Sequence, residues 1–396
     1  MLCSVMSCPS VQVDTIPKKT PILYQNPPRS DSGRNLENSD TPLSNARRFW
    51  YHTCQEARRI DFGLFFRRVL LSMNQTNTIT PYTKRPMSNE DLAALLFSRG
   101  LVADRDKLLR VLAAVGYYRL SGYLVPFKDK RTDNFIKGTT LDDVWSIYTL
   151  DRNLRLTAMD ALARIEVAVR ALVTRHHTAH NADPFAYVDP NNLPKISPAR
   201  HADLLRHIEN AVSNARQEPF IKHLAIAHGI TQYPPIWTMM EIIPMGTLTY
   251  YYEGLPDPVQ QKIANTFHVR PNVFGGWLMV LKKIRNVCAH QGRLWNKPLA
   301  VASTRKIGSA SELDPLRQCL DAQAQNGHTN TFSALSLCAY CLNVIRPESN
   351  WIERCKSLVK STSSFARTGM GFPNDWEKYT LWATNEASGD AANTNP

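Results

Sequence analysis

The sequence predicts a mainly α-helical protein. Its strongest signal is the segment 141–178, in which apolar side chains recur at steps of three and four residues along the whole length. Alternating apolar and polar runs, the pattern of half-buried strands, are scarce. A chain of 396 residues is also too long for one small core. We therefore expect a helical bundle with smaller helical parts before and after it.

The first part of the chain differs in composition from the rest. Residues 1–72 are rich in Ser, Pro, Asn and Arg and show no sustained period, so we expect a disordered N-terminal extension. Met73 then opens a segment typical of the start of a protein. A misassigned start codon and a genuine flexible tail both fit this pattern. The polar last residues, 387–396, are expected to form a disordered tail.

Residues 73–138 are expected to form a small N-terminal helical subdomain. Ser88 is a candidate N-cap, and Gly100 supplies a stop signal for the helix that begins there. A second helix is predicted over 104–115. The string that follows it, "GYYRLSGYLVPF", is aromatic and rich in Gly, and we interpret it as a packed turn with a short extended piece.

Residues 139–300 are expected to form the main bundle, and residues 301–386 a C-terminal helical region. Thr140 can cap the long helix, whose apolar stripe requires other helices to cover it. Further helices are predicted over 198–216, around 234–243, from Asp257 onward, over 273–292 and, as one or two helices broken near Pro347, over 332–360.

The charge balance favours a polyanionic partner. The formal net charge is +13, and Lys and Arg that neutralise phosphates release counterions. No segment reaches the roughly 18 uninterrupted apolar residues of a membrane helix, and no signal-peptide pattern opens the chain. We therefore expect RNA as a partner, no membrane contact and a cytoplasmic location.

The eight cysteines are scattered and lack the spacing of a disulfide scaffold. Cys338 and Cys341 form a single "CAYC" pair, whereas a zinc ribbon needs a second pair. We interpret both as small apolar core residues on a helix. Free thiols are typical of a reducing cytoplasm. We expect neither a metal nor a cofactor.

The candidate functional residues lie in the string "RNVCAHQGRLWN", at 285–296. On the predicted helix, Asn286, His290 and Arg293 form a polar stripe, which reaches Arg293 only if the helix continues that far. Arg285 lies beside this stripe, with a side chain long enough to bend toward it. The opposite stripe is apolar and must face the core. It consists of Trp277, Leu281, Ile284 and Cys288.

These residue types suit metal-independent cleavage of RNA. His exchanges protons near neutrality, and Arg holds a phosphate through two hydrogen bonds. We expect His290 to act as acid or base when a 2′-OH attacks the adjacent phosphate, while Arg285 stabilises the charge and Asn286 orients either partner. No carboxylate cluster for Mg²⁺ lies nearby. The spacing alone is weak, because Arg175 and His180 repeat it, and a solvated helix face is the alternative.

The whole string resembles the "RN-x-x-AH-x-x-RLWN" signature of the Abi family, the AbiD/AbiF-like proteins of bacterial phage-abortive systems. Further blocks resemble the family in the same order, and the resemblance covers roughly 75–385. These blocks are "LLFSRGLVADRDKLLRVLAAVGYYRLSGYLVPF", "IYTLDRNLRLTAMDALARIEVAVR", "YPPIWTMMEIIPMGTLTYYYEGL" and "GFPNDWEKYTLW".

The resemblance implies a HEPN-like helical bundle, because the family is placed in the HEPN superfamily, whose RNA-cleaving members carry an Arg and a His at this spacing. Those members commonly act as dimers with a composite site, which implies a homodimer. Arg285 and His290 match the superfamily pair, with Asn286 as its usual polar neighbour. Members often have a second His where this chain has Gln291. The residues that match the family's extension are Arg293, Trp295 and Asn296.

Two further pairs lie on the long helix. Glu166 and Arg170, at i and i+4, are interpreted either as a structural ion pair or as a pair in which Glu166 orients Arg285, because related HEPN proteins carry a polar residue on the partner helix. His176 and His180 have the spacing of two metal ligands but lack a third. Basic residues at a helix C-terminus are the favoured interpretation of that pair.

Tyr117, Tyr118, Arg119 and Tyr123 mix aromatic and basic character. They fit an RNA-stacking surface, and equally a set of tyrosines that packs the subdomain against the bundle.

The combined prediction is a HEPN-type endoribonuclease that acts as a toxin-like effector during phage infection. The alternative is a module that binds structured RNA without cutting it, and a scaffold without RNA is a third reading. An antitoxin RNA or protein is consistent with the first two, although no residue in the chain identifies one.

Overall fold

The computed structural model describes residues 83, 85–299, 307–324 and 331–383. Within them the chain forms α-helices α3 to α16 and no β-strand, which confirms the predicted mainly α class. The extension predicted over 1–72 and the tail predicted over 387–396 lie outside these residues. Contacts divide the chain into Met1–Lys84 and Arg85–Pro396, and every helix named below belongs to the second unit.

The unit begins with three short helices, α3 (Asn89–Ser98), α4 (Arg105–Val115) and α5 (Tyr117–Leu124). The predicted cap is confirmed, because Ser88 forms a capping box with Asp91. The predicted turn and extended piece after Gly116 is wrong, since that string forms α5. Gly116, at φ 75°, breaks the chain between α4 and α5. Leu120 and Leu124, one turn apart, then bury one face of α5, and this packing overrides the turn signals.

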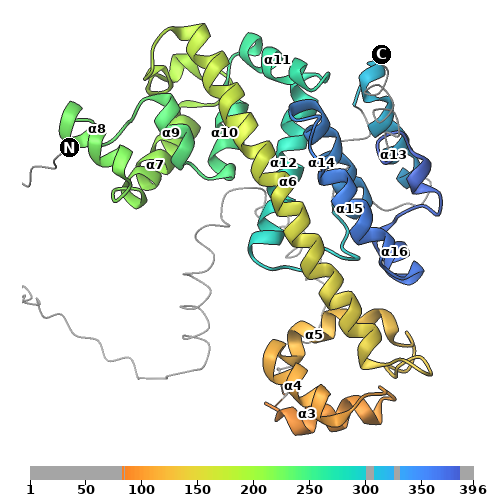
Figure 1. Cartoon of the computed structure of the whole chain (residues 1–396). Coiled ribbons are helices and arrows are strands. Elements are labelled where there is room, and N and C mark those ends of the chain that lie inside the picture. The colour runs from red at the N-terminus through yellow and green to blue at the C-terminus, as the bar shows by residue number, and fades with distance from the viewer. Residues whose placement is uncertain (1–82, 84, 300–306, 325–330, 384–396) are drawn as a thin grey trace, which may run out of the picture. The chain divides into compact units, whose positions relative to one another are not determined.

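Helix α6 (Leu141–Asn181) lies at the centre of the unit. Thr140 caps it through a capping box, as predicted. Helices α9, α11, α12, α14 and α15 pack along it and cover its buried apolar stripe (Figure 1). Such a helix is stabilised mainly by the neighbours that cover its stripe and only weakly by its own propensity.

Six helices follow α6 in the bundle, namely α7 (Pro198–Asn214), α8 (Pro219–His228), α9 (Ile236–Ile242), α10 (Met245–Gly254), α11 (Asp257–Thr266) and α12 (Pro271–Ala289). The C-terminal helices are α13 (Asp314–Ala324), α14 (Thr331–Ile345), α15 (Trp351–Lys360) and α16 (Ser364–Met370). Ser197 caps α7, as its sequence predicts. The predicted break near Pro347 separates α14 from α15. Helices α8, α10, α13 and α16 were not predicted individually, although α13 and α16 lie in the predicted C-terminal helical region.

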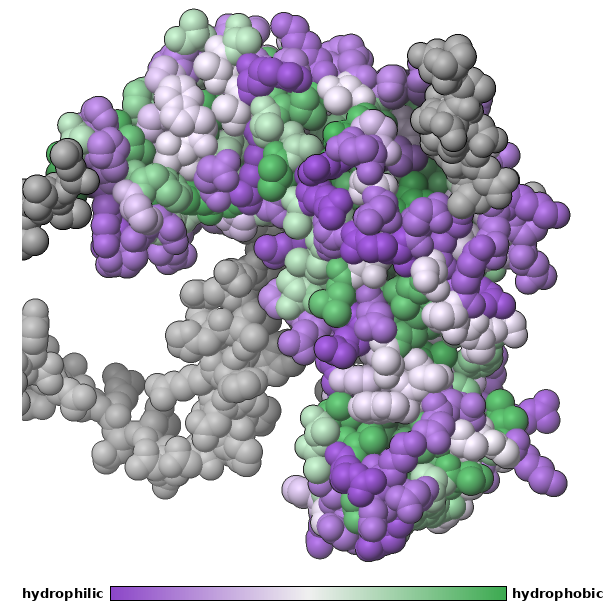
Figure 2. Space-filling view, viewed as in Figure 1, coloured by the Kyte–Doolittle hydropathy of each residue, from purple (hydrophilic) through white to green (hydrophobic). Residues whose placement is uncertain are grey.

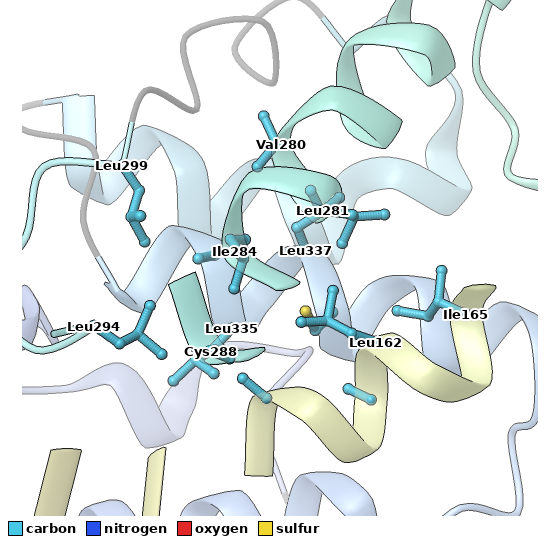
Figure 3. Close-up of a cluster of buried hydrophobic side chains, with 14 of the residues drawn as sticks. Leu162, Ile165, Val280, Leu281, Ile284, Cys288, Leu294, Leu299, Leu335 and Leu337 are labelled. Carbon is cyan, nitrogen blue, oxygen red and sulfur yellow. The ribbon is translucent and has the colours of Figure 1, made fainter. Parts of the chain in front are cut away.

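The core beside the candidate motif joins α6, α12 and α14. Figure 3 shows their apolar side chains gathered in one cluster, together with two leucines that follow α12. Cys338 and Cys341 of α14 are free and buried, so the prediction that they are core residues is confirmed. The residues of this apolar cluster that Figure 3 labels are Leu162, Ile165, Val280, Leu281, Ile284, Cys288, Leu294, Leu299, Leu335 and Leu337.

The surface shown in Figure 2 carries mainly hydrophilic residues, with hydrophobic ones scattered among them. Among the described helices, none is both long and apolar enough to cross a membrane.

Candidate functional site

Helix α12 ends inside the candidate motif. His290 is its C-cap, and the next residue, Gln291, adopts the left-handed conformation at φ 55°. The N–H of Gly292 donates to the carbonyl of Val287 at 2.7 Å, and the N–H of Gln291 donates to that of Cys288 at 3.0 Å. This is the Schellman arrangement, here with Gln in the position that usually holds Gly.

This ending corrects the prediction for Arg293. The helix was expected to reach residue 292, but it ends at Ala289, so Arg293 does not continue the stripe of Asn286 and His290. The left-handed residue turns the chain away before Arg293 is reached. Its guanidinium instead donates to the carbonyl of Gly122 on α5.

The two predicted faces of α12 are confirmed as far as the helix extends. Trp277, Leu281, Ile284 and Cys288 are buried. Asn286 and His290 are exposed, and the backbone N–H of His290 donates to the carbonyl of Asn286 at 3.0 Å. Burial raises the pKa of the Cys288 thiol to about 12, so this cysteine stays protonated beside the motif and is not a nucleophile. The buried stripe therefore anchors the helix and leaves Asn286 and His290 open to solvent.

Lys282 extends the polar stripe by one turn and was not among the predicted residues. It precedes Asn286 by four positions, and its half-buried side chain donates to the sulfur of Met279 at 3.3 Å. Burial lowers the pKa of its ammonium below the usual range. The sequence contained the signal, because residues 282, 286 and 290 repeat at steps of four.

Arg285 differs from the other arginines in the described part of the chain. It is half-buried, and it makes no hydrogen bond or ion pair with a described residue. Every other described arginine whose side chain lacks such a partner is exposed. Its guanidinium is not among the buried polar groups without a partner, so its N–H groups face solvent and can meet an anion there.

A buried carboxylate holds the loop that follows His290. Asp151 of α6 is completely buried and accepts the backbone N–H groups of Leu294 at 2.9 Å and Trp295 at 2.6 Å. It also accepts the hydroxyl of Tyr123 at 2.6 Å and a guanidinium N–H of Arg155. Four donors therefore satisfy one charge, which is the condition for burying it.

Sequence reasoning missed Asp151 and Arg155. The available signal was that both charged residues interrupt the apolar stripe of the long helix, close to Leu154. Their partners lie far away in the sequence, on α5 and after α12.

Helix α5 also forms hydrogen bonds with the loop that follows His290. Arg119 donates to the carbonyl of Gln291 at 2.8 Å, and Arg293 donates back to the carbonyl of Gly122. Arg155 approaches the carbonyl of Gly292 at 3.5 Å. The loop after His290 is thus fixed from α5 and α6 together.

The remaining residues of the motif differ in exposure. Trp295 is completely buried, and its indole N–H donates to the carbonyl of Ala366 at 2.9 Å, so it ties the loop to α16. Asn296 is exposed and adopts φ 48°. Trp295 is therefore a packing residue in this fold, whereas Asn296 is free to contact solvent.

The predicted pair on α6 forms an ion pair. Arg170 donates to Glu166 at 2.5 Å and also to the carbonyls of Glu241 at 3.0 Å and Ile243 at 2.9 Å. No hydrogen bond or ion pair joins Glu166 to Arg285 in the described structure. The pair ties α6 to the end of α9, which fits the structural interpretation.

The histidines near the end of α6 behave differently from one another. His176 is half-buried and His180 is exposed, while His177 between them is buried. The ring Nδ1 of His177 lies 2.6 Å from the hydroxyl of Tyr251. Desolvation lowers the pKa of His177 to about 4. Over the described residues, no group of three or more His, Cys, Asp or Glu side chains could hold a metal ion.

The four residues predicted to stack on RNA all lie on α5 but differ in exposure. Tyr118 is 92% exposed, and Tyr117 and Arg119 are half-buried. Tyr123 is only 2% exposed and bonds Asp151, so its ring has no open face and its inclusion in a stacking surface is wrong. Burial, first of all, raises the pKa of the Tyr123 hydroxyl, which keeps it a donor to the carboxylate.

Part of the chain matches a known protein family. Residues 110–296 match the model of the Abi-like protein family. The matched segment contains the whole string 285–296 and the Asp151 node, by which we mean the buried Asp151 carboxylate and its four donors. It lies within residues 75–385, over which the sequence resembles the Abi family. No curated protein and no solved structure matches the chain.

Proposed function

From the match of residues 110–296 to the Abi-like family, which supports the Abi family and a role in abortive infection, we propose that this chain is an RNA-cleaving effector of that response. The site is the end of α12, where Arg285, Asn286 and His290 lie. We assign the chain to the AbiD/AbiF-like members and to the HEPN superfamily as part of this proposal. It acts in the cytoplasm, where its RNA substrate would be found.

The unpaired guanidinium of Arg285 carries the proposal. Arg285 has no acceptor among the described residues, and a phosphodiester would offer two oxygens to its planar fork. His290, five residues along, is exposed and free to meet a substrate. The Asp151 node fixes the loop after it, which supports a preorganised site.

The proposed reaction needs two proton transfers. One group takes the proton from the 2′-OH, whose oxygen then bonds to phosphorus, and another gives a proton to the departing 5′-oxygen. Arg285 stabilises the charge on the phosphoryl oxygens between these steps. Each chain offers one histidine in the motif, so we propose that two copies face each other and share the roles of acid and base.

A binding protein that does not cut RNA is the second candidate. The net charge of +13 favours RNA binding as much as cleavage. Gln291 stands where related proteins often have a second His, and its side chain cannot exchange protons near neutrality.

The experiment compares the fragments found in cellular RNA after incubation, in EDTA, with the purified wild type or with each purified variant. We expect fragments from the wild type, and none from Arg285→Ala or His290→Ala. Arg175→Ala and His180→Ala are matched controls, because they alter the other Arg and His at this spacing, both of which are exposed. Identical RNA patterns from all five proteins, with equal retention of RNA in a gel, would support the binding protein instead.

A further inference from the structure

A column of planar side chains stands on the N-terminal part of α6. The rings of Trp145 and Tyr148 stack with their centroids 4.8 Å apart and their planes at 15°. The guanidinium of Arg119, from α5, lies 5.7 Å from the centroid of the Tyr148 ring. The buried Tyr123 meets the Tyr148 ring edge-on, with the ring centroids 5.3 Å apart, so Trp145 and Arg119 are the outer members of this group.

This column ends beside the candidate site. The guanidinium of Arg119 donates to the carbonyl of Gln291 at 2.8 Å, and Gln291 directly follows His290. The same arginine thus touches both the aromatic pair and the motif loop. The column and the motif loop are therefore joined by a direct contact at the residue after His290.

The column is open to solvent at several points. Trp145, Tyr148 and Arg119 are half-buried, and Tyr118, which precedes Arg119 in the chain, is 92% exposed. The indole N–H of Trp145 and the hydroxyls of Tyr118 and Tyr148 have no hydrogen-bond partner among the described residues. Large aromatic groups with free polar edges are suited to stack on a base and to bond its edge.

The charge around the column suits a phosphodiester chain. Arg152, one turn after Tyr148, is exposed and has no described acceptor. The nearby carboxylates are already engaged. Asp142 pairs with Lys107, Asp143 belongs to the capping box of α6, and Asp151 is enclosed by its four donors. Among the described residues, no carboxylate therefore neutralises Arg119 or Arg152.

We propose that Tyr118, Arg119, Trp145 and Tyr148 form a stacking platform for unpaired bases next to the phosphate at His290. The substrate is then single-stranded RNA, because the bases of a duplex are already stacked and paired and cannot reach such a platform. This inference rests on the proposed function, since it deepens the description of the same site. It adds Trp145 and Tyr148, which the sequence did not indicate.

The test measures binding in the full-length His290→Ala protein, which should not cleave its probe. The probe is a labelled RNA oligonucleotide without self-pairing, and the competitor is the same RNA as a duplex. Tyr118→Ala changes an exposed ring, and Trp145→Leu keeps an apolar side chain in place, while thermal unfolding checks that each variant folds. Trp237→Ala, on an exposed tryptophan of α9, is the matched control.

We expect each platform variant to weaken binding by between about fivefold and about a hundredfold, the range of one lost stacking contact. Trp237→Ala should leave the affinity unchanged, and the duplex should compete poorly. Trp145→Phe, which retains a ring, should restore most of the binding lost in Trp145→Leu.

The proposal is overturned by unchanged affinity in both platform variants, by equal effects of Trp237→Ala, by equal binding of the duplex, or by no RNA binding at all. Because these measurements record binding only, they are separate from the cleavage assay. Platform-dependent binding without cleavage would overturn the proposed reaction and keep the platform.

Discussion

The carboxylate of Asp151 accepts the backbone N–H of Trp295 at 2.6 Å, although 144 positions separate the two residues in the chain. Asp151 lies in the N-terminal third of α6, and Trp295 lies just beyond the candidate site. This contact fixes the chain that leaves the site to α6, the helix against which α9, α11, α12, α14 and α15 pack. The site's geometry is therefore a property of the whole bundle rather than of α12 alone.

Asp151→Asn should destabilise the protein by about 3 kcal/mol. The amide removes the buried charge that Arg155 pairs with, and it points an N–H group toward donors that then lack an acceptor. Urea unfolding measures the loss. Asp160→Asn, on the same helix but in a more exposed ion pair, is the control and should cost no more than about 1 kcal/mol. Equal losses in the two variants would argue against the node.

Gln291→Gly should stabilise the protein by up to about 1 kcal/mol. The residue sits at φ 55°, where a side chain is strained, and its hydrogen bond to Arg119 uses only the backbone carbonyl. Gln291→Val, with a branched side chain, should destabilise the protein instead. Thermal unfolding of both variants tests the sign, and a stabilising Val would contradict the assigned backbone conformation.

Gly369→Ala should destabilise the protein by about 2 kcal/mol through overpacking. A Cβ atom at this position of α16 would lie 2.5 Å from Cζ2 of Trp295, so the buried ring would have to move. Gly246→Ala is the control, because the nearest side-chain atom lies 4.0 Å from its Cβ. Unfolding midpoints in urea compare the two, and no difference between them would show that Trp295 is loosely held.

His177 should make stability depend on pH. Burial lowers its pKa from 6.5 to about 4, so between these values the unfolded chain binds a proton that the folded chain does not. Its contribution to stability is therefore complete above about pH 6.5 and declines as the pH falls toward 4. The decline amounts to at most about 3 kcal/mol.

Unfolding free energies at pH 7 and pH 4.5 measure this effect. The difference between the two pH values should shrink in His177→Gln and persist in His223→Gln, which alters an exposed histidine of α8. An unchanged difference in His177→Gln would assign the pH dependence to other groups.

Local signals predicted most of the helices. The apolar repeat gave α6 its first residue and nearly its last, and capping residues such as Ser88, Thr140 and Ser197 marked helix starts that the structure contains. Helix α5 was missed because glycines are typical of turns and tyrosines of extended segments, while packing against α6 favours the helix.

The site was only partly predictable from sequence. The projection of α12 gave the exposure of Asn286 and His290 correctly, because the helix is anchored by a regular apolar stripe. It failed for Arg293, because the helix ends through the left-handed conformation of Gln291. A glycine is the usual residue at such a position, and here the position holds Gln. Asp151 could not be assigned because its partners are brought to it by the fold. The chemical roles of Arg285, Asn286 and His290 remain predictions.

The chemistry of the RNA ends tests the central claim most directly. Attack by a 2′-OH leaves a 2′,3′-cyclic phosphate on one fragment and a 5′-hydroxyl on the other, and it cannot occur where the ribose carries no 2′-OH. We predict these ends in EDTA from the wild type, no fragments from His290→Ala, and no cut at a position that carries a 2′-deoxy sugar. Fragments with 5′-phosphate ends, or fragments that persist in His290→Ala, would contradict the account.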